Sequence, residues 1–213
     1  MISHNNKCIY IHAPRTAGTS VESAFGAWHS VEAERRLSVG CRVLPNNKCI
    51  QHHRIDELIY AGLLNESQAK EYCKFTFVRN PWDRMVSTYM WFMDDTNPGV
   101  SDFFDRKASC FDEFVEMFFR YSGAGDVTHR YSQVSYLWTR YGVNFVGRFE
   151  NLQKDFDVVC DKIGIPHQEL LHIGKTEHKP YWEYYTDDSR EFILDRYKDD
   201  IETFGYKFGE EKE

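Results

Sequence analysis

Two short segments combine arginine with hydroxyl and small residues, a pattern that suits the binding of phosphate or sulfate. The small residues of the first segment let main-chain amides approach an oxyanion closely, its hydroxyl groups add donors, and an arginine can bind two oxygens at once. Taken alone, a turn followed by a helix cap is the better explanation of this segment. It is not the phosphate loop of nucleoside triphosphatases, because the Gly-Lys pair is missing. The residues of this first candidate site are Arg15, Thr16, Ala17, Gly18, Thr19 and Ser20.

The second segment begins with Arg79 and reaches Ser87 eight residues later. Arg79 follows aromatic and β-branched residues that are typical of a strand, and Asn80 with Pro81 is typical of a helix start. Such a helix places Ser87 on the same face as Asp83, and the carboxyl end of a strand is where open α/β sheets bind ligands. Taken alone, the segment is also explained by a capped helix whose serine hydroxyl faces solvent.

Strands and helices alternate along the chain and are expected to position these two segments. We predict strands over residues 7–13, 75–78 and 144–147 from their apolar and β-branched character. This alternation favours a parallel sheet with helices on both faces. One domain over residues 1–213 is expected from the length of the chain. Predicted helices cover residues 21–28, 56–61, 66–72, 81–93, 111–121, 134–141, 152–163 and 187–204.

The composition restricts the partners that the chain can bind. Its formal net charge of −7 argues against a general nucleic-acid surface, so an anionic ligand must be held by local groups. The six cysteines show no metal-ligand spacing, and we predict reduced thiols, although Cys41 and Cys49 could pair in an oxidising compartment. Because the chain has no leader pattern and no apolar run of membrane-spanning length, a cytoplasmic protein without membrane contacts is expected.

Together, the two segments resemble the nucleotide-binding motifs of the carbohydrate-type sulfotransferases, which use 3′-phosphoadenosine 5′-phosphosulfate (PAPS). Residues 9–20 resemble the 5′-phosphosulfate loop of that family, and residues 77–89 resemble its 3′-phosphate motif. The resemblance implies that Arg15 contacts the 5′-phosphate and the transferring sulfonate, while the rest of the loop holds the phosphate. It also implies that Arg79 and Ser87 bind the 3′-phosphate.

One residue departs from the family pattern, because Arg15 stands where lysine is usual. Arginine keeps its proton, so it can stabilise the leaving phosphate by charge but cannot protonate it. Residues 146–152 resemble the end of the family's third core strand and place Phe149 near adenine, although a core position also explains this aromatic residue. Lys175 is a further candidate contact to the nucleotide phosphate. The implied fold is α/β, a P-loop-like three-layer fold with a central parallel sheet flanked by helices.

Sulfonate transfer requires a base that takes the proton of the acceptor hydroxyl, and histidine has a suitable pKa. His52 and His53 lie between the two motifs, in the interval where the resemblance places a His or Glu base. His52, followed by Glu57, is the closer match, and His53 is its competitor. Glu22 could orient a histidine or be a solvated helix residue.

Two polar stretches, residues 94–110 and 123–133, are predicted to shape the acceptor pocket, and the resemblance makes His129 and Gln133 acceptor-side candidates. The predicted function is transfer of a sulfonate group from PAPS to a hydroxyl of a carbohydrate or small metabolite, without a metal ion. A kinase-like phosphotransferase is the first alternative, opposed by the missing Gly-Lys pair and the lack of an obvious magnesium-binding aspartate. A catalytically silent nucleotide-binding domain is the second, favoured by the arginine at position 15.

Overall fold

The computed structural model describes residues 1–26, 51–94, 107–120, 127–171, 173 and 178–210. The chain divides into two compact units. Unit 1 comprises residues 1–78, 135–174 and 213, and unit 2 comprises residues 79–134 and 175–212. That residues 1–213 form a single domain stays a prediction.

Unit 1 is built on a mixed sheet of four strands in the order β1-β2-β3-β4. Strand β2 (Cys8–Ile11) is parallel to β3 (Cys73–Val78), and β3 is parallel to β4 (Phe145–Arg148). The three predicted strands and their parallel arrangement are therefore confirmed, with small shifts at their ends. Strand β1 (Ile2–Ser3) pairs antiparallel with β2 and was not predicted, because two residues are too few to show a period.

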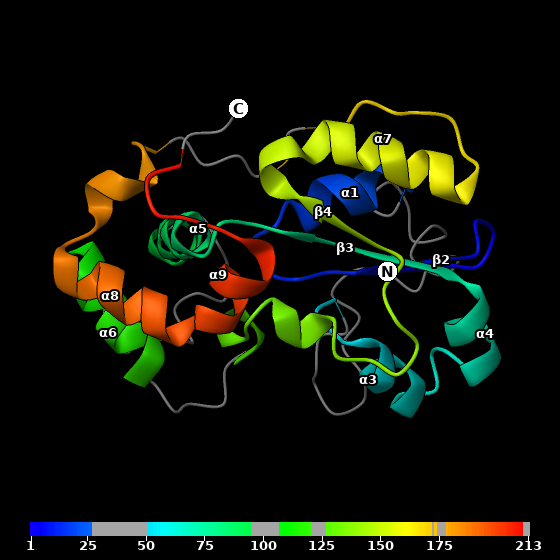
Figure 1. The fold of residues 1–213 in the computed structure, drawn as a ribbon, viewed down its shortest axis with the longest axis horizontal. Helices are drawn as coiled ribbons and strands as arrows, with labels where there is room; N and C mark the ends of the chain where they lie inside the picture. The colour runs from blue at the N-terminus through cyan, green and yellow to red at the C-terminus, as the bar shows by residue number, and fades with distance from the viewer. Residues whose placement is uncertain (27–50, 95–106, 121–126, 172, 174–177, 211–213) are drawn as a thin grey trace. The chain divides into compact units, whose positions relative to one another are not determined.

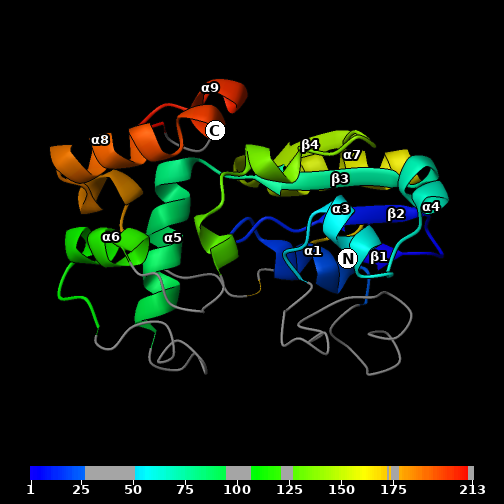
Figure 2. The same cartoon turned by 90° about the horizontal axis from the view of Figure 1, so that it is seen from below.

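Helices lie on both sides of this sheet (Figures 1 and 2). One side carries α1 (Gly18–Ala24) and α7 (Leu152–Ile163), and the other carries α3 (Ile55–Tyr60) and α4 (Glu66–Glu71). The predicted α/β fold with a helix-flanked sheet is confirmed. Helix α7 has the predicted bounds and ends at Gly164, whose φ of 72° is one that glycine adopts without strain.

The core of unit 1 lies between the sheet and the helices α1 and α7. Side chains two residues apart on a strand point to the same face, so Phe75 and Phe77 of β3 both turn toward these helices. They pack with Tyr10 of β2, Val21 of α1 and Phe156 of α7. This packing fixes the carboxyl ends of β2 and β3, from which the two candidate segments begin.

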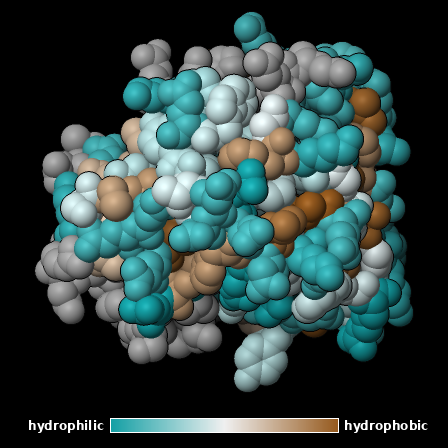
Figure 3. All heavy atoms as spheres, turned by 60° about the vertical axis from the view of Figure 1, so that its left-hand side comes forward, coloured by the Kyte–Doolittle hydropathy of each residue, from teal (hydrophilic) through white to brown (hydrophobic). Residues whose placement is uncertain are grey.

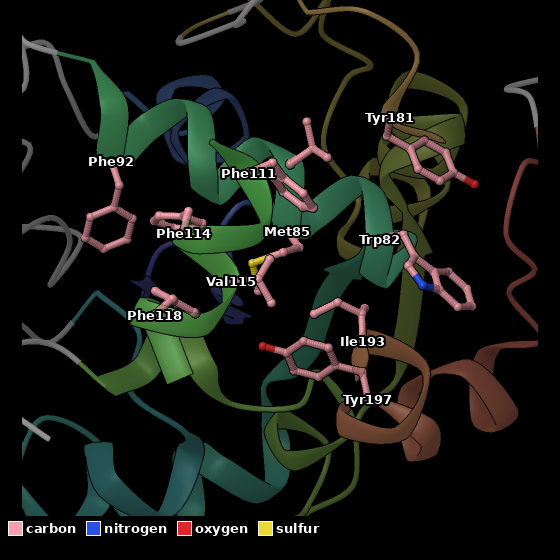
Figure 4. Close-up of a cluster of buried hydrophobic side chains, with 11 residues drawn as sticks. Trp82, Met85, Phe92, Phe111, Phe114, Val115, Phe118, Tyr181, Ile193 and Tyr197 are labelled. Carbon is pink, nitrogen blue, oxygen red and sulfur yellow. The ribbon is translucent and has the colours of Figure 1, made fainter. Parts of the chain in front are cut away.

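In the described part of unit 2, all the regular elements are helices or 3₁₀ turns. Helix α5 (Pro81–Met93) has the predicted bounds, and α6 (Phe111–Arg120) begins at its predicted residue, while its predicted last residue, Tyr121, lies outside the described residues. The short 3₁₀ turns η2 (Val127–Arg130) and η5 (Tyr181–Tyr184) connect the longer elements. Side chains from α5, α6 and the C-terminal helices meet in one apolar cluster (Figure 4).

The apolar residues of α6 show why this helix packs as it does. Phe111, Phe114, Val115 and Phe118 recur at the spacing that places side chains on one helix face, and all four are buried. Figure 4 shows this face turned toward side chains of α5, among them Met85. The local sequence thus determines both the helix and the face that it buries.

The helix predicted over residues 134–141 is wrong. The structure has only a 3₁₀ turn, η3 (Val134–Tyr136), followed by turns in which Thr139 N donates to Leu137 O. Trp138 is 62% exposed, so the apolar residues that suggested a helix are not gathered on one buried face. Apolar spacing alone therefore predicted a helix that no packing supports.

The helix predicted over residues 187–204 is two helices, α8 (Asp187–Arg196) and α9 (Lys198–Phe204). Tyr197 separates them with φ −117° and ψ 30°, and its ring is buried in the apolar cluster of unit 2. Helix-type hydrogen bonds still continue across this residue, because Tyr197 N donates to Ile193 O and Ile201 N donates to Tyr197 O. Burial of the Tyr197 ring is accompanied by a local bend.

Polar residues predominate on the face drawn in Figure 3, where apolar residues form small patches. In the part of the chain that the structure describes, no helix combines the length and apolar character needed to cross a membrane. Four cysteines carry free thiols: Cys8, Cys73, Cys110 and Cys160. The other two, Cys41 and Cys49, lie outside the described residues.

Candidate functional site

The predicted phosphate loop follows β2 directly and has an unusual main chain. Arg15 and Ala17 have φ values of 65° and 64°, in the left-handed region that non-glycine residues rarely adopt. Ala17 precedes the first residue of α1, Gly18, and makes no side-chain cap hydrogen bond. Turns that include left-handed residues direct successive amides to one side, which creates a concave anion site.

Side-chain hydroxyl groups hold this loop in place. Thr16 is fully buried and its Oγ1 donates to the carbonyl oxygen of Ala13 at 2.8 Å, across the turn. Ser20 is also buried, and its Oγ accepts a hydrogen bond from Ile173 N at 3.3 Å. Arg15 and Thr19 are half-buried. The loop therefore alternates between residues that anchor it and residues that reach solvent.

Beside this loop lies a buried group of ionisable side chains in unit 1. Nδ1 of His12 is 3.1 Å from Oε1 of Glu22, and Nε2 of Gln51 donates to the other oxygen of Glu22 at 3.3 Å. Burial alone raises the pKa of Glu22, but the charge and hydrogen bond of His12 outweigh it, so the pKa is lowered. Glu22 is fully buried, which contradicts a solvated position and agrees with its possible role of orienting a histidine.

The two histidines between the motifs differ in how they are held. His52 is 9% exposed, and its Nδ1 lies 3.0 Å from the carbonyl oxygen of His12. His53 is half-buried. Glu57 does not pair with His52: its oxygens accept from Arg54 N at 2.7 Å and from Arg54 Nη2 at 3.0 Å, which caps α3. The carboxylate near His52 is Glu22 instead, which also acts on it electrostatically.

His12 was missed by sequence reasoning, although its position offered a signal. It follows Ile11, the last residue of β2, and lies three residues before Arg15. From the sequence, a histidine at this position is interpreted as a strand residue. Its partner Glu22 lies ten residues later, on α1. Only the strand–loop–helix geometry brings the two together.

In unit 2, the arginine of the second motif is held by the helix that follows it. The Oδ1 of Asn80 accepts from Trp82 N and Pro81 is the first helical residue, as predicted. Nε of Arg79 donates to Oδ2 of Asp83 at 2.8 Å, and both side chains are buried. Ser87 is also buried, so the alternative in which its hydroxyl faces solvent is wrong.

Gln133 holds the main chain of Arg79. Its Oε1 accepts from Arg79 N at 2.8 Å, and its Nε2 donates to Arg79 O at 2.8 Å. The main-chain N–H groups of Gln133 and Val134 donate to the two carboxylate oxygens of Asp200, both at 2.8 Å. Gln133 is fully buried. Both ends of its amide thus bind the main chain of Arg79, a supporting role that the sequence did not predict, and its acceptor-side role stays a prediction.

The remaining predicted residues lie in different surroundings. His129 is stacked on Trp91, with ring centroids 5.3 Å apart and planes at 14°, and is 9% exposed. Phe149 is half-buried and begins the 3₁₀ turn η4 (Phe149–Asn151) directly after β4. Lys175 lies outside the described residues, as do large parts of the two stretches predicted to shape the acceptor pocket.

Comparisons with known proteins agree with this picture. The family model described as "Sulfotransferase family" matches residues 1–207, which include both candidate segments. An uncharacterized protein of Archaeoglobus fulgidus is 32% identical over 116 residues, which is 52% of this chain and 82% of that protein.

A crystal structure of mouse sulfotransferase SULT7A1 complexed with PAP has a similar fold, with a TM-score of 0.55 and 12% identity. The match covers 94% of this chain and 86% of the mouse chain, and it confirms the predicted P-loop-like fold. Since the family model extends over nearly the whole sequence, the chain belongs to the sulfotransferase family.

Proposed function

We propose that this protein transfers a sulfonate group from PAPS to a hydroxyl group of an acceptor, releasing 3′-phosphoadenosine 5′-phosphate (PAP). The observation that carries the proposal is family membership over residues 1–207, because the matched region contains both anion-binding segments. The left-handed Arg15 and Ala17 support it, since they give the loop a shape suited to an oxyanion. No metal ion is required in this proposal.

In the reaction, the acceptor oxygen attacks sulfur in line with the bond to the 5′-phosphate oxygen. The new O–S bond forms as that S–O bond breaks, and the bonding electrons leave with PAP. Arg15 stabilises the negative charge that develops on the phosphate, and it does so without donating a proton. The amides of the loop, with the hydroxyl of Thr19, hold the 5′-phosphate. Arg79 and Ser87 hold the 3′-phosphate.

The acceptor proton is taken by His52 in this proposal. A carbonyl oxygen only accepts hydrogen bonds, so the contact between Nδ1 of His52 and the carbonyl of His12 requires the proton on Nδ1. In the neutral ring, Nε2 then carries the lone pair that a base needs. This fixed tautomer favours His52 over His53. For the acceptor we propose a glycan or a small hydroxyl-bearing metabolite, with His129 on the acceptor side.

The test measures nucleotide binding by calorimetry and sulfonate transfer with labelled PAPS against glycan, phenol and alcohol acceptors. We expect the purified full chain to bind PAP with micromolar affinity or better. Arg79→Ala removes a buried cation beside Asp83, and we expect an affinity loss of about 30-fold or more. Arg120→Ala is the matched control, because Arg120 is an exposed arginine of unit 2 that pairs with Glu116 on the surface of α6.

In the same transfer assay, His52→Asn is expected to abolish turnover while His53→Asn retains it. Binding of ATP with magnesium in place of PAP would contradict the proposal and favour a phosphotransferase. Binding of PAP without transfer to any acceptor, and without hydrolysis of PAPS, would favour a silent nucleotide-binding domain.

A further inference from the structure

His12 occupies a position from which it contacts several parts of the candidate site in unit 1. It follows β2, is 4% exposed, and stacks on the ring of Tyr10 at 5.4 Å between centroids. The hydrogen bond between its Nδ1 and Glu22 fixes the rotation of the imidazole ring. Glu22 is held in turn by Gln51. The ring is thus fixed from one side by a buried carboxylate and from another by an aromatic face.

The imidazole of His12 lies directly against the main chain of Gly18. A Cβ atom built on Gly18 would overlap Nε2, Cδ2 and Cε1 of this ring. Gly18 does not have a positive φ, so the conformation of its main chain does not require glycine. What requires glycine is the close approach of the His12 ring to the first residue of α1. The ring therefore forms the inner support of the loop at the residue where the helix begins.

The main chain of His12 contacts the candidate base as well. Its carbonyl oxygen accepts the hydrogen bond from Nδ1 of His52, and the two imidazole rings meet edge to face with centroids 4.7 Å apart. One residue thus supports the loop through its side chain and orients His52 through its carbonyl group. The contacts of the ring with Gly18 and with the His52 ring depend on where the Glu22 carboxylate holds it.

We propose that His12, oriented by Glu22, is a positioning residue that sets the phosphosulfate loop and the His52 imidazole in one geometry. This inference rests on the proposed function, because it assigns roles within the same site. His12 does not touch the reacting atoms in this scheme. Its effect is that a displaced ring moves Gly18 and His52 together, and misplacement by about 1 Å can lower a rate about 100-fold.

The first experiment compares PAP binding by the full chain and three variants. Gly18→Ala forces the His12 ring out of its place, and we expect PAP affinity to fall tenfold or more. The double variant His12→Ala/Gly18→Ala removes the ring that the new methyl group would overlap, so it should regain part of the lost affinity. Its sulfonate transfer should stay low, because the ring that contacts His52 is absent. Gly147→Ala is the matched control, because its Cβ would overlap the Phe77 ring in the core of unit 1, away from the loop. It should lower the melting temperature without changing the affinity of the folded protein for PAP.

The second measurement uses the unmodified chain, so it does not depend on whether a variant folds. The ¹⁵N resonances of the imidazole rings are recorded with and without PAP, and His12→Asn assigns the His12 signals. We expect the signals of both His12 and His52 to shift on binding, because the His12 ring is packed against Gly18 of the loop and the His52 ring contacts the His12 ring. A histidine that only stabilises the fold would keep its resonances unchanged.

The outcomes separate the inference from the proposed function. If the chain binds PAP but the double variant binds as weakly as Gly18→Ala, or if the His12 signals do not move, the positioning role is wrong while the sulfotransferase proposal stands. If the unmodified chain does not bind PAP at all, the proposed function fails and this inference fails with it.

Discussion

The two arginine-bearing segments are held by opposite means. In unit 1, the loop before α1 has a strained main chain, with left-handed Arg15 and Ala17, and it rests on the buried pair His12–Glu22. In unit 2, the segment that begins at Arg79 has no such residue among those described, and the neutral amide of Gln133 holds its main chain. One segment thus depends on a strained main chain and the His12–Glu22 pair, and the other on side-chain hydrogen bonds to its main chain and on the ion pair between Arg79 and Asp83.

The difference has a physical explanation in what each segment is proposed to do. A loop that surrounds the reacting phosphosulfate must direct many amides inward, and that concave shape requires unfavourable dihedral angles supported by surrounding groups. A segment that binds a 3′-phosphate needs only one well-placed arginine, which a capped helix and an ion pair to Asp83 provide. We therefore expect the loop to respond to pH, and the Arg79 segment to respond mainly to the loss of hydrogen bonds.

The largest loss of stability is expected from Gln133→Ala. This substitution leaves the N–H and the carbonyl of Arg79 without their partner in a buried position, and each unsatisfied buried group costs about 1–3 kcal/mol. We expect a loss of about 3 kcal/mol in the free energy of unfolding, measured with urea, and a marked loss of PAP affinity at the displaced Arg79.

The matched control for this prediction is Gln153→Ala. Gln153 also makes several hydrogen bonds, to Asp157, Gln168 O and Leu170 N, but it is exposed on α7 of unit 1. Water can replace its lost partners, so the cost should stay below about 1 kcal/mol. Equal losses in the free energy of unfolding for the two variants would show that the burial of the hydrogen bonds between Gln133 and Arg79 has no special importance.

A smaller loss of stability, which depends on pH, is expected from Glu22→Gln. The pKa of Glu22 is lowered in the folded chain from its ordinary value of 4.5, so the ionised carboxylate stabilises the fold above that pH and loses this contribution as the pH falls. Removing the charge should cost about 2 kcal/mol at pH 7, as for hydrogen bonds to charged groups. The difference from the unmodified chain should shrink below pH 4.5.

The control for the loss of stability at low pH is Glu57→Gln. The pKa of Glu57 is also lowered: burial raises it, but the side-chain and main-chain hydrogen bonds of Arg54 outweigh that. This carboxylate is partly exposed at the start of α3, so the solvent screens its ion pair and the effect of substitution should be smaller. A pH-independent cost for Glu22→Gln would contradict an ionised Glu22 carboxylate that stabilises the fold.

Much of the local structure could be predicted because its causes are local. Asn80 and Pro81 mark the start of α5, Gly164 marks the end of α7, and the small and hydroxyl residues before α1 mark the loop. The resemblance of the two motifs then predicted the family and the fold. These signals lie within a few residues of the features that they determine.

The supporting contacts could not be predicted, because they join residues that are distant in sequence. Gln133 lies 54 residues from Arg79 and 67 from Asp200, and the carbonyl of His12 lies 40 residues from its partner His52. The sequence therefore suggested Gln133 as an acceptor contact but did not reveal its hydrogen bonds to Arg79, nor the contact between His52 and the carbonyl of His12. Neither the burial of a glutamine nor a contact between residues so distant in sequence follows from local spacing.

The smallest effect is expected from relieving the strain of the loop with Ala17→Gly. A left-handed alanine costs about 1–2 kcal/mol, but glycine also gains conformational freedom in the unfolded chain, which offsets about 0.4–1 kcal/mol. We expect a net stabilisation of about 0.5 kcal/mol by urea denaturation. Lys7→Gly is the matched control, because Lys7 has a φ of 46° in the turn between β1 and β2, away from the loop. If the two variants gain similar stability but only Ala17→Gly loses PAP affinity, the left-handed alanine serves to shape the anion site. If Ala17→Gly instead lowers the stability by more than about 1 kcal/mol, Ala17 is not strained and the contrast between the two segments lies in their charges alone.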